Sequence, residues 1–205
     1  MERVAIYLAG NIKKGHEQTN EDYWSEVELK IISEVIAPVK VDFLHPAVRS
    51  DDLSDQKSVF GRDMTQVYCS HVVFVDVRQR RGLGVGAEMM WAKMNNIAVV
   101  SLCPPESHYQ RSTVDILDVR VENWIHPFVY GLSDKVAATV AEGAEWIKQF
   151  ILNELQVEIK GREFIQETML HYRNTQYEKD APMQMLMQGN KRLMEKMWGE
   201  VRLIS

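Results

Sequence analysis

The sequence has little of what several kinds of protein require. It holds two cysteines, Cys69 and Cys103, among 205 residues, and its six histidines show no HxH or HExxH spacing, so we expect no metal site. No apolar run approaches the length that spans a membrane, and the first residues lack a signal-peptide pattern. We therefore expect a cytoplasmic protein with both thiols buried and reduced.

A surplus of positive charge is also missing. The formal net charge is −5, which argues against a protein that coats nucleic acid, because phosphate contacts need an excess of Lys and Arg. Hydrophobic residues make up 45% and charged residues 26%, as in ordinary globular proteins. We find no repeats and no low-complexity tract, and the length suggests one domain with room for an extension.

Short apolar runs alternate with amphipathic segments along most of the chain. We predict strands at 4–9, 39–44, 72–77, 97–103 and 124–130, and helices at 23–35, 59–70, 87–95 and 133–155. Pro127 suits an edge position in the fifth strand, and Ser133 is a candidate N-cap for the last helix. This alternation predicts a doubly wound α/β domain, Rossmann-like or flavodoxin-like, with a five-stranded parallel sheet.

The last fifty residues differ from the rest. We assign 1–156 to the α/β domain and 157–205 to a C-terminal helical extension, with helices at 163–177 and 183–201. The extension is rich in methionine. We expect a helical hairpin that packs on the domain or on a second subunit, and a Met-rich peptide-binding surface is the alternative.

The most informative segment is Gly82-Leu83-Gly84-Val85-Gly86-Ala87-Glu88, which follows the third predicted strand and precedes a helix. We expect a glycine loop here, whose backbone N–H groups can approach a phosphate closely. A Glu beside an anion site needs a reason, and nucleophilic attack on a sugar carbon would supply one. The alternative for Glu88 is a surface residue that the helix dipole stabilises.

The same glycines also satisfy a dinucleotide fingerprint, Gly82-x-Gly84-x-x-Ala87, with Glu106 at a suitable distance. We disfavour an NAD(P) oxidoreductase, because the motif follows the third strand instead of the first. Three further residues, 79–81, separate it from the strand, and the helix after it is short.

Basic residues crowd the ends of the first and third strands. They are Lys13, Lys14 and His16 after the first strand, and Arg78, Arg80 and Arg81 after the third. Because the carboxyl ends of neighbouring parallel strands share one crevice, we expect an anion site there instead of ordinary solvated loops.

Three further residues are candidates for the same site. Asp76 interrupts an apolar strand and needs a partner or a ligand. Asp63 precedes an apolar helical stretch, and Tyr7 lies in the first strand. Their ordinary interpretations are a solvated helix face for Asp63 and a core position for Tyr7.

Taken together, these segments resemble the nucleoside 2-deoxyribosyltransferase superfamily. The resemblance covers about residues 3–150 and is closest to 2′-deoxynucleoside 5′-phosphate N-hydrolases and CMP N-glycosidases. It rests on Ile6-Tyr7-Leu8-Ala9-Gly10, Arg62-Asp63, Ser70-His71-Val72-Val73-Phe74-Val75-Asp76, Gly84-Val85-Gly86-Ala87-Glu88 and the strand 97–102.

The resemblance implies roles for individual residues. Glu88 would be the nucleophile that attacks C1′ of the sugar, Asp63 would protonate or hold the leaving base or orient Glu88, and Tyr7 would orient the nucleophile or contact the sugar. The substrate and its phosphate would be bound by Gly10, Asn11, Ile12, Lys13, Asp76, Gly84 and Gly86.

We therefore expect an N-glycosidase that cleaves the base–sugar bond of a nucleoside 5′-monophosphate through a covalent glycosyl-Glu88 intermediate, without a cofactor. Base exchange between deoxynucleosides uses the same residues and stays open, as does a non-catalytic nucleotide sensor whose Met-rich tail engages a partner. The resemblance also implies a homodimer or a higher homo-oligomer.

Overall fold

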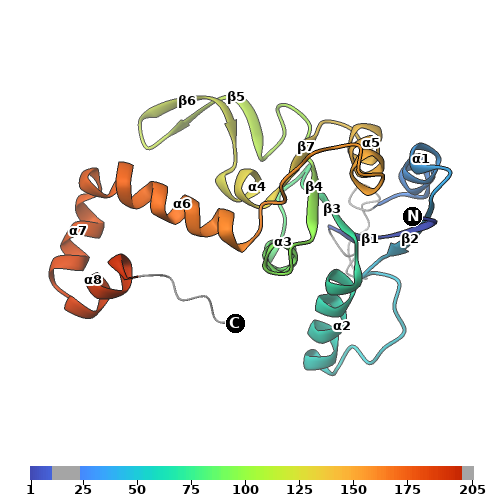
Figure 1. Ribbon diagram of the computed structural model, residues 1–205, viewed down its shortest axis with the longest axis horizontal. Coiled ribbons are helices and arrows are strands. Elements are labelled where there is room, and N and C mark those ends of the chain that lie inside the picture. Colours follow the sequence, from blue (N-terminus) through green and yellow to red (C-terminus); the bar gives the residue numbers. More distant parts are fainter. Residues whose placement is uncertain (11–23, 200–205) are drawn as a thin grey trace. The chain divides into compact units, whose positions relative to one another are not determined.

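The computed structural model describes residues 1–10 and 24–199 and divides the chain into two compact units, Met1–Gly161 and Arg162–Ser205. Figure 1 shows the elements of both units. The first unit contains β1 (Arg3–Ala9), α1 (Glu26–Ile36), β2 (Lys40–Leu44), α2 (Gln56–Cys69), β3 (Val72–Asp76), α3 (Leu83–Met94), β4 (Ala98–Leu102), β5 (Gln110–Ile116), β6 (Val119–Ile125), α4 (Pro127–Leu132), β7 (Lys135–Ala137) and α5 (Val140–Ile151).

A five-stranded parallel sheet forms the centre of this unit. Its strand order is β2-β1-β3-β4-β7, and every neighbouring pair is parallel. This is the doubly wound α/β fold that the alternation of strands and helices predicts. In such folds the chain crosses over at the β1/β3 position, and ligands bind outside the carboxyl ends of these strands.

The two faces of the sheet bury separate apolar clusters. Along β1 the side chains of Val4, Ile6 and Leu8 enter the cluster that α1 and α5 cover, whereas Tyr7 and Ala9 enter the other cluster. That second cluster also holds buried residues of α2, α3 and α4. The pleat of β1 therefore points Tyr7 at the layer that carries α3.

The fifth strand and the helix after it differ from the prediction. The strand expected at 124–130 is wrong: Trp124 and Ile125 end β6, and Pro127 begins α4. Proline fits the first turn of a helix, where its missing N–H has no partner to lose, and the His126 side chain caps that turn. The sheet is completed instead by the short strand β7.

The long helix predicted from Ser133 is also shorter than expected. Its counterpart α5 begins only at Val140, with Thr139 as N-cap, and it ends at Ile151. Ser133 instead follows the last turn of α4, and its hydroxyl lies 2.7 Å from that of Ser101 on β4.

Strands β5 and β6 form an antiparallel hairpin between β4 and α4 that the sequence analysis did not predict. The turn has positive φ at both Leu117 and Asp118. Such turns are usually recognised by Asn-Gly or Asp-Gly, so a Leu-Asp turn carries no familiar signal.

The glycine segment is not a loop. Helix α3 begins at Leu83, four residues before the predicted start, and Gly82 is its N-cap. Glycine has the weakest helix propensity of the non-proline residues, which is why the pattern predicted a later start. No glycine in the described ranges has a positive φ.

The second unit contains α6 (Arg162–Thr175), a short 3₁₀ helix η1 (Tyr177–Lys179), α7 (Ala181–Gln188) and α8 (Lys191–Trp198). The single helix predicted over 183–201 is wrong, because Gly189 ends α7 and Asn190 caps α8. Tyr177 and Trp198 pack edge to face with ring centroids 5.5 Å apart. Few side chains are buried here, and Met185 and Leu186 are exposed.

The structure corrects one expectation on the thiols, since Cys69 is exposed and only Cys103 is buried. Within the described ranges, helices that combine the length and the apolar composition needed to cross a membrane are absent.

Candidate active site

Tyr7 and Glu88 meet on the α3 side of the sheet. Tyr7 is fully buried on β1, and its hydroxyl donates a 2.8 Å hydrogen bond to Oε1 of Glu88, one turn into α3. The other carboxylate oxygen, Oε2, is buried and accepts no hydrogen bond from the described residues. A buried polar atom without a partner costs roughly 1–3 kcal/mol, so a fold does not retain one for stability.

The surroundings of Glu88 alter its protonation. Burial raises the pKa of Glu88 from 4.5 to about 7, although the hydrogen bond from Tyr7 lowers it, and the negative charge of Asp63 raises it further. Burial and the charge of Glu88 also raise the pKa of Tyr7, so the Tyr7 hydroxyl stays protonated and donates. Near neutral pH this carboxyl group can therefore exist in both protonation states.

Asp63 lies on α2, close enough for its charge to affect both Tyr7 and Glu88. The structure thus brings together the three residues predicted to be catalytic. Burial raises the pKa of Asp63, whereas the charges of Arg49 and Arg62 lower it. The net direction of the pKa is upward, because burial outweighs the two arginine charges.

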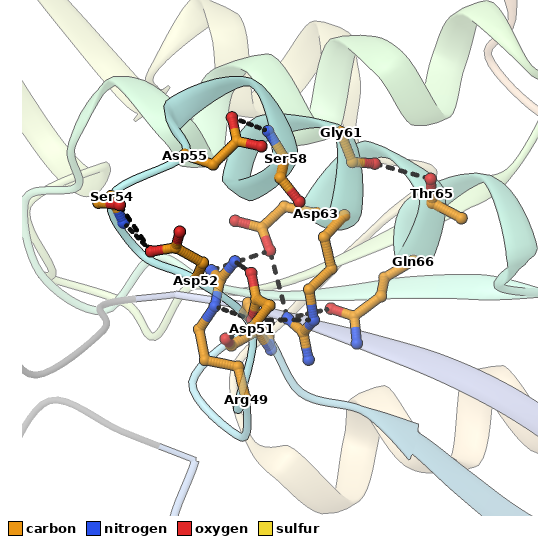
Figure 2. Close-up of polar contacts among 12 residues, drawn as sticks. Arg49, Asp51, Asp52, Ser54, Asp55, Ser58, Gly61, Asp63, Thr65 and Gln66 are labelled. Carbon is orange, nitrogen blue, oxygen red and sulfur yellow. Dashed lines mark hydrogen bonds and ion pairs between the residues drawn. The ribbon is translucent and has the colours of Figure 1, made fainter.

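A network of arginines and aspartates holds Asp63 by one oxygen (Figure 2). Arg49 binds both oxygens of Asp51, at 2.8 and 2.5 Å, and its Nη1 lies 3.4 Å from Oδ1 of Asp63. Arg62 contacts the same Oδ1 at 3.4 Å and donates to the carbonyl oxygen of Val48 at 2.7 Å. Figure 2 shows the second oxygen of Asp63 turned away from Arg49.

Asp76 ends β3 and is buried, with 1% of its side chain exposed. Its Oδ1 accepts from the backbone N–H and Nε of Arg78, and its Oδ2 lies 2.6 Å from Nη2 of Arg81. Arg78 also pairs with Glu28 at 2.6 Å. Arginines thus bind both oxygens of Asp76. A substrate would have to compete with these ion pairs, and direct binding of substrate by Asp76 stays a prediction.

The first turn of α3 is open on its outer side. A Cβ built on Gly82 or Gly86 would meet nothing within 4 Å among the described residues, and one on Gly84 would meet only Oε1 of Glu88, at 4.0 Å. Open space above Gly84 therefore leads to the Glu88 carboxylate. By contrast, a Cβ on Gly143 would lie 2.4 Å from Cζ of Phe74, so packing requires that glycine.

The helical conformation changes what each predicted glycine can offer a ligand. The first N–H groups of a helix lack intrahelical partners, so those of Gly82 and Gly84 can bind an anion. Gly86 lies two positions after Gly84, where an α-helical N–H bonds back to the carbonyl oxygen four residues earlier, that of Gly82. Gly86 therefore provides no N–H donor for a ligand, and it can only leave space for one.

The first predicted phosphate loop is described only at its start. Gly10 follows β1, and a Cβ there would lie 3.5 Å from Cβ of Asp76, so the ends of β1 and β3 adjoin. Asn11, Ile12 and Lys13 lie outside the described residues, as do the basic residues Lys14 and His16.

Sequence reasoning did not identify two site residues. Arg49 was missed because its partners, Asp51 and Asp63, join it only once the segment after β2 folds over α2. Tyr109 was missed because it lies in the connection between β4 and the hairpin, which has no recognisable pattern. Its hydroxyl accepts a 3.0 Å hydrogen bond from the backbone N–H of Arg81. Within the described ranges, groupings of three or more His, Cys, Asp or Glu side chains suited to a metal ion are absent.

No protein-family model matches the chain, and neither does any curated protein sequence.

Proposed function

We propose that the protein belongs to the nucleoside 2-deoxyribosyltransferase superfamily and cleaves the N-glycosidic bond of a nucleoside 5′-monophosphate. The observation that carries the proposal is the pair Tyr7–Glu88. The carboxylate is buried beside the open first turn of α3, Tyr7 binds one of its oxygens, and the other has no partner among the described residues. A carboxylate of this kind stabilises the positive charge that develops at C1′ when a base departs.

In the proposed first step, the ionised carboxylate of Glu88 attacks C1′ and forms a glycosyl ester. The C1′–N bond breaks, and its electron pair goes to the nitrogen of the base, which takes a proton from Asp63. The raised pKa of Asp63 favours this role, and the hydrogen bond from Tyr7 fixes the orientation of the nucleophile.

In the second step, water attacks C1′ and breaks the ester, which restores the Glu88 carboxylate. The carboxylate of Asp63 takes the proton of that water and is ready for the next cycle. If a second base attacks in place of water, the same residues perform base exchange, so the transferase is the alternative within this chemistry.

The test is to incubate the protein with a panel of ribo- and deoxyribonucleoside monophosphates and to measure free base by chromatography, with and without an added acceptor base. Glu88→Gln should abolish product, and Glu145→Gln on the exposed face of α5 is the matched control. Free base without acceptor supports the hydrolase, and product only with acceptor supports the transferase.

A nucleotide sensor is the candidate from a different class, and the second unit favours it. Its helix α7 exposes Met185 and Leu186, which is typical of adaptable protein-binding surfaces. A sensor would bind nucleotide without turnover and would tolerate Glu88→Gln in binding. Turnover that Glu88→Gln abolishes would exclude it as the sole function.

We also propose that the protein forms a homodimer through α2 and α3. These helices pack together, with Nε1 of Trp91 donating to the carbonyl oxygen of Met64 at 3.1 Å, and they expose Phe60, Tyr68 and Leu83. Large exposed apolar side chains favour association, and we propose that a second copy of the chain covers these. Light scattering should give a dimer mass that Phe60→Glu reduces to the monomer.

A further inference from the structure

Arg81 has a side-chain nitrogen that no described residue binds. Its side chain is 3% exposed, its Nε donates to the carbonyl oxygen of Asp76, and its Nη2 pairs with Oδ2 of Asp76. Nη1 is buried and has no hydrogen-bond partner among the described residues. Because the guanidinium is planar, the edge that carries Nε and Nη2 faces Asp76, and the two N–H groups of Nη1 point away from it.

In the sequence, Arg81 is followed at once by a second group of donors, the N–H groups at the start of α3. Arg81 directly precedes Gly82, the N-cap of the 12-residue helix α3, and Gly82 has no side chain to occupy the N–H groups of the first turn. The backbone N–H of Arg81 is itself fixed by the hydroxyl of Tyr109 at 3.0 Å. A guanidinium beside a helix N-terminus is the combination of donors that phosphate monoesters prefer.

Arg78 differs from Arg81 in the partners of its side-chain nitrogens. Both arginines bind Asp76. Arg78 donates from Nη1 to Glu28 at 2.6 Å, and from Nη2 and Nε to Asp76 at 3.1 and 2.9 Å. All three of its side-chain nitrogens thus have acidic partners. The pair Arg78 and Arg81 therefore provides a matched comparison within one ion-pair network.

We propose that Arg81 is the specificity-determining residue that binds the phosphate monoester of the substrate through Nη1. This inference rests on the proposed function and names the side chain that would make the enzyme prefer a nucleoside monophosphate to the nucleoside. Asp76 then acts as a positioning residue, because it holds the guanidinium with Nη1 turned away from the carboxylate.

The test compares Arg81→Gln with Arg78→Gln in two measurements on the full chain. The first is the affinity for ribose 5-phosphate, by calorimetry, with ribose as the probe that lacks phosphate. The second is kcat/KM for a monophosphate and for its nucleoside. Arg81→Gln should weaken ribose 5-phosphate binding at least tenfold and lower kcat/KM for the monophosphate alone, whereas Arg78→Gln should cause a smaller loss in both, because the nitrogens of Arg78 are already bound to Asp76 and Glu28. Should Arg81→Gln fail to fold, Arg81→Lys keeps the charge next to Asp76 but lacks Nη1 and serves the same comparison.

Equal losses in the two variants would overturn the proposal, because they would trace the effect to Asp76. Wild-type protein that does not bind ribose 5-phosphate, or an Arg81 variant that binds as wild type does, would also overturn it. Binding that depends on Arg81 in a protein that releases no base from any nucleotide would support the role of Arg81 and would refute the N-glycosidase instead.

Discussion

Replacing Glu88 by Gln tests the cost of the buried carboxylate through stability alone. Burial raises the pKa of Glu88 from 4.5 to about 7 in the folded protein. Between these pH values the folded protein holds a proton that the unfolded chain has lost, so the free energy of unfolding falls as pH rises. At about 1.36 kcal/mol per pH unit, the ionised carboxylate costs about 3 kcal/mol above pH 7 relative to pH values below 4.5.

Gln keeps the shape of the side chain and removes the charge. We therefore expect Glu88→Gln to be about 3 kcal/mol more stable than wild type at pH 8, and the difference to vanish near pH 4.5. Urea unfolding at intervals from pH 4.5 to 8.5 measures it, and subtracting the two curves cancels the groups that titrate in both proteins. A difference that does not vary with pH, or that has the opposite sign, would refute the reasoning.

Glu142→Gln is the control of opposite sign. The hydrogen bond and charge of Lys135, with two backbone N–H groups, lower the pKa of Glu142. Its stabilisation is therefore present above its ordinary pKa and is lost as pH falls through the lowered one. Glu142→Gln should be less stable than wild type at pH 8, and the loss should fade in acid. The same trend in both variants would assign the effect to other groups.

Three further outcomes follow from the contacts described above. Tyr7→Phe removes a hydrogen bond to the charged form of Glu88, of about 1.5–3 kcal/mol, so the pKa of Glu88 should rise by roughly 1–2 units, measurable by infrared spectroscopy of the carboxylate. Gly84→Ala should stabilise α3 by about 0.5–1 kcal/mol and weaken phosphate binding. Gly143→Ala should destabilise the protein by about 1–3 kcal/mol, because its Cβ would overlap the ring of Phe74. Urea unfolding distinguishes the two signs. Lys93→Met leaves the buried carboxylate of Asp134 without its ion-pair partner and should lower the free energy of unfolding by about 3–5 kcal/mol in the same assay.

The sheet could be predicted where burial alone determines the strand. β1, β3 and β4 are apolar runs, and the structure confirms them within one or two residues. β7 has only three residues, so it is too short to give a pattern. The hairpin strands alternate, with Val114 and Val121 on one face, but their turn lacks a glycine.

Within the site, the positions of single residues could be anticipated and their partners could not. A Tyr on the first strand and a Glu after the third reach one another because the strands are neighbours in the sheet, which the alternation of elements already implies. Ion pairs are different. Whether an arginine after β3 meets Asp76, Glu28 or a ligand depends on side-chain positions that no local pattern encodes, so the sequence predicted an anion site without separating Arg78 from Arg81.

The first turn of α3 departs from the choices that would stabilise a helix. Gly84 and Gly86 occupy positions where Ala would fit, each at a cost of roughly 1 kcal/mol, and the N-cap Gly82 offers no side-chain acceptor. In the residues that flank this turn in the sequence, Nη1 of Arg81 and Oε2 of Glu88 are buried and have no hydrogen-bond partner in the described part of the chain. Local rules fail together mainly where a protein binds or reacts, because a ligand supplies the missing contacts. The two unpartnered atoms carry opposite charge, which fits a ligand with an anionic group at one end and an electrophilic carbon at the other. A nucleoside monophosphate has that arrangement: its phosphate is separated by the sugar from C1′.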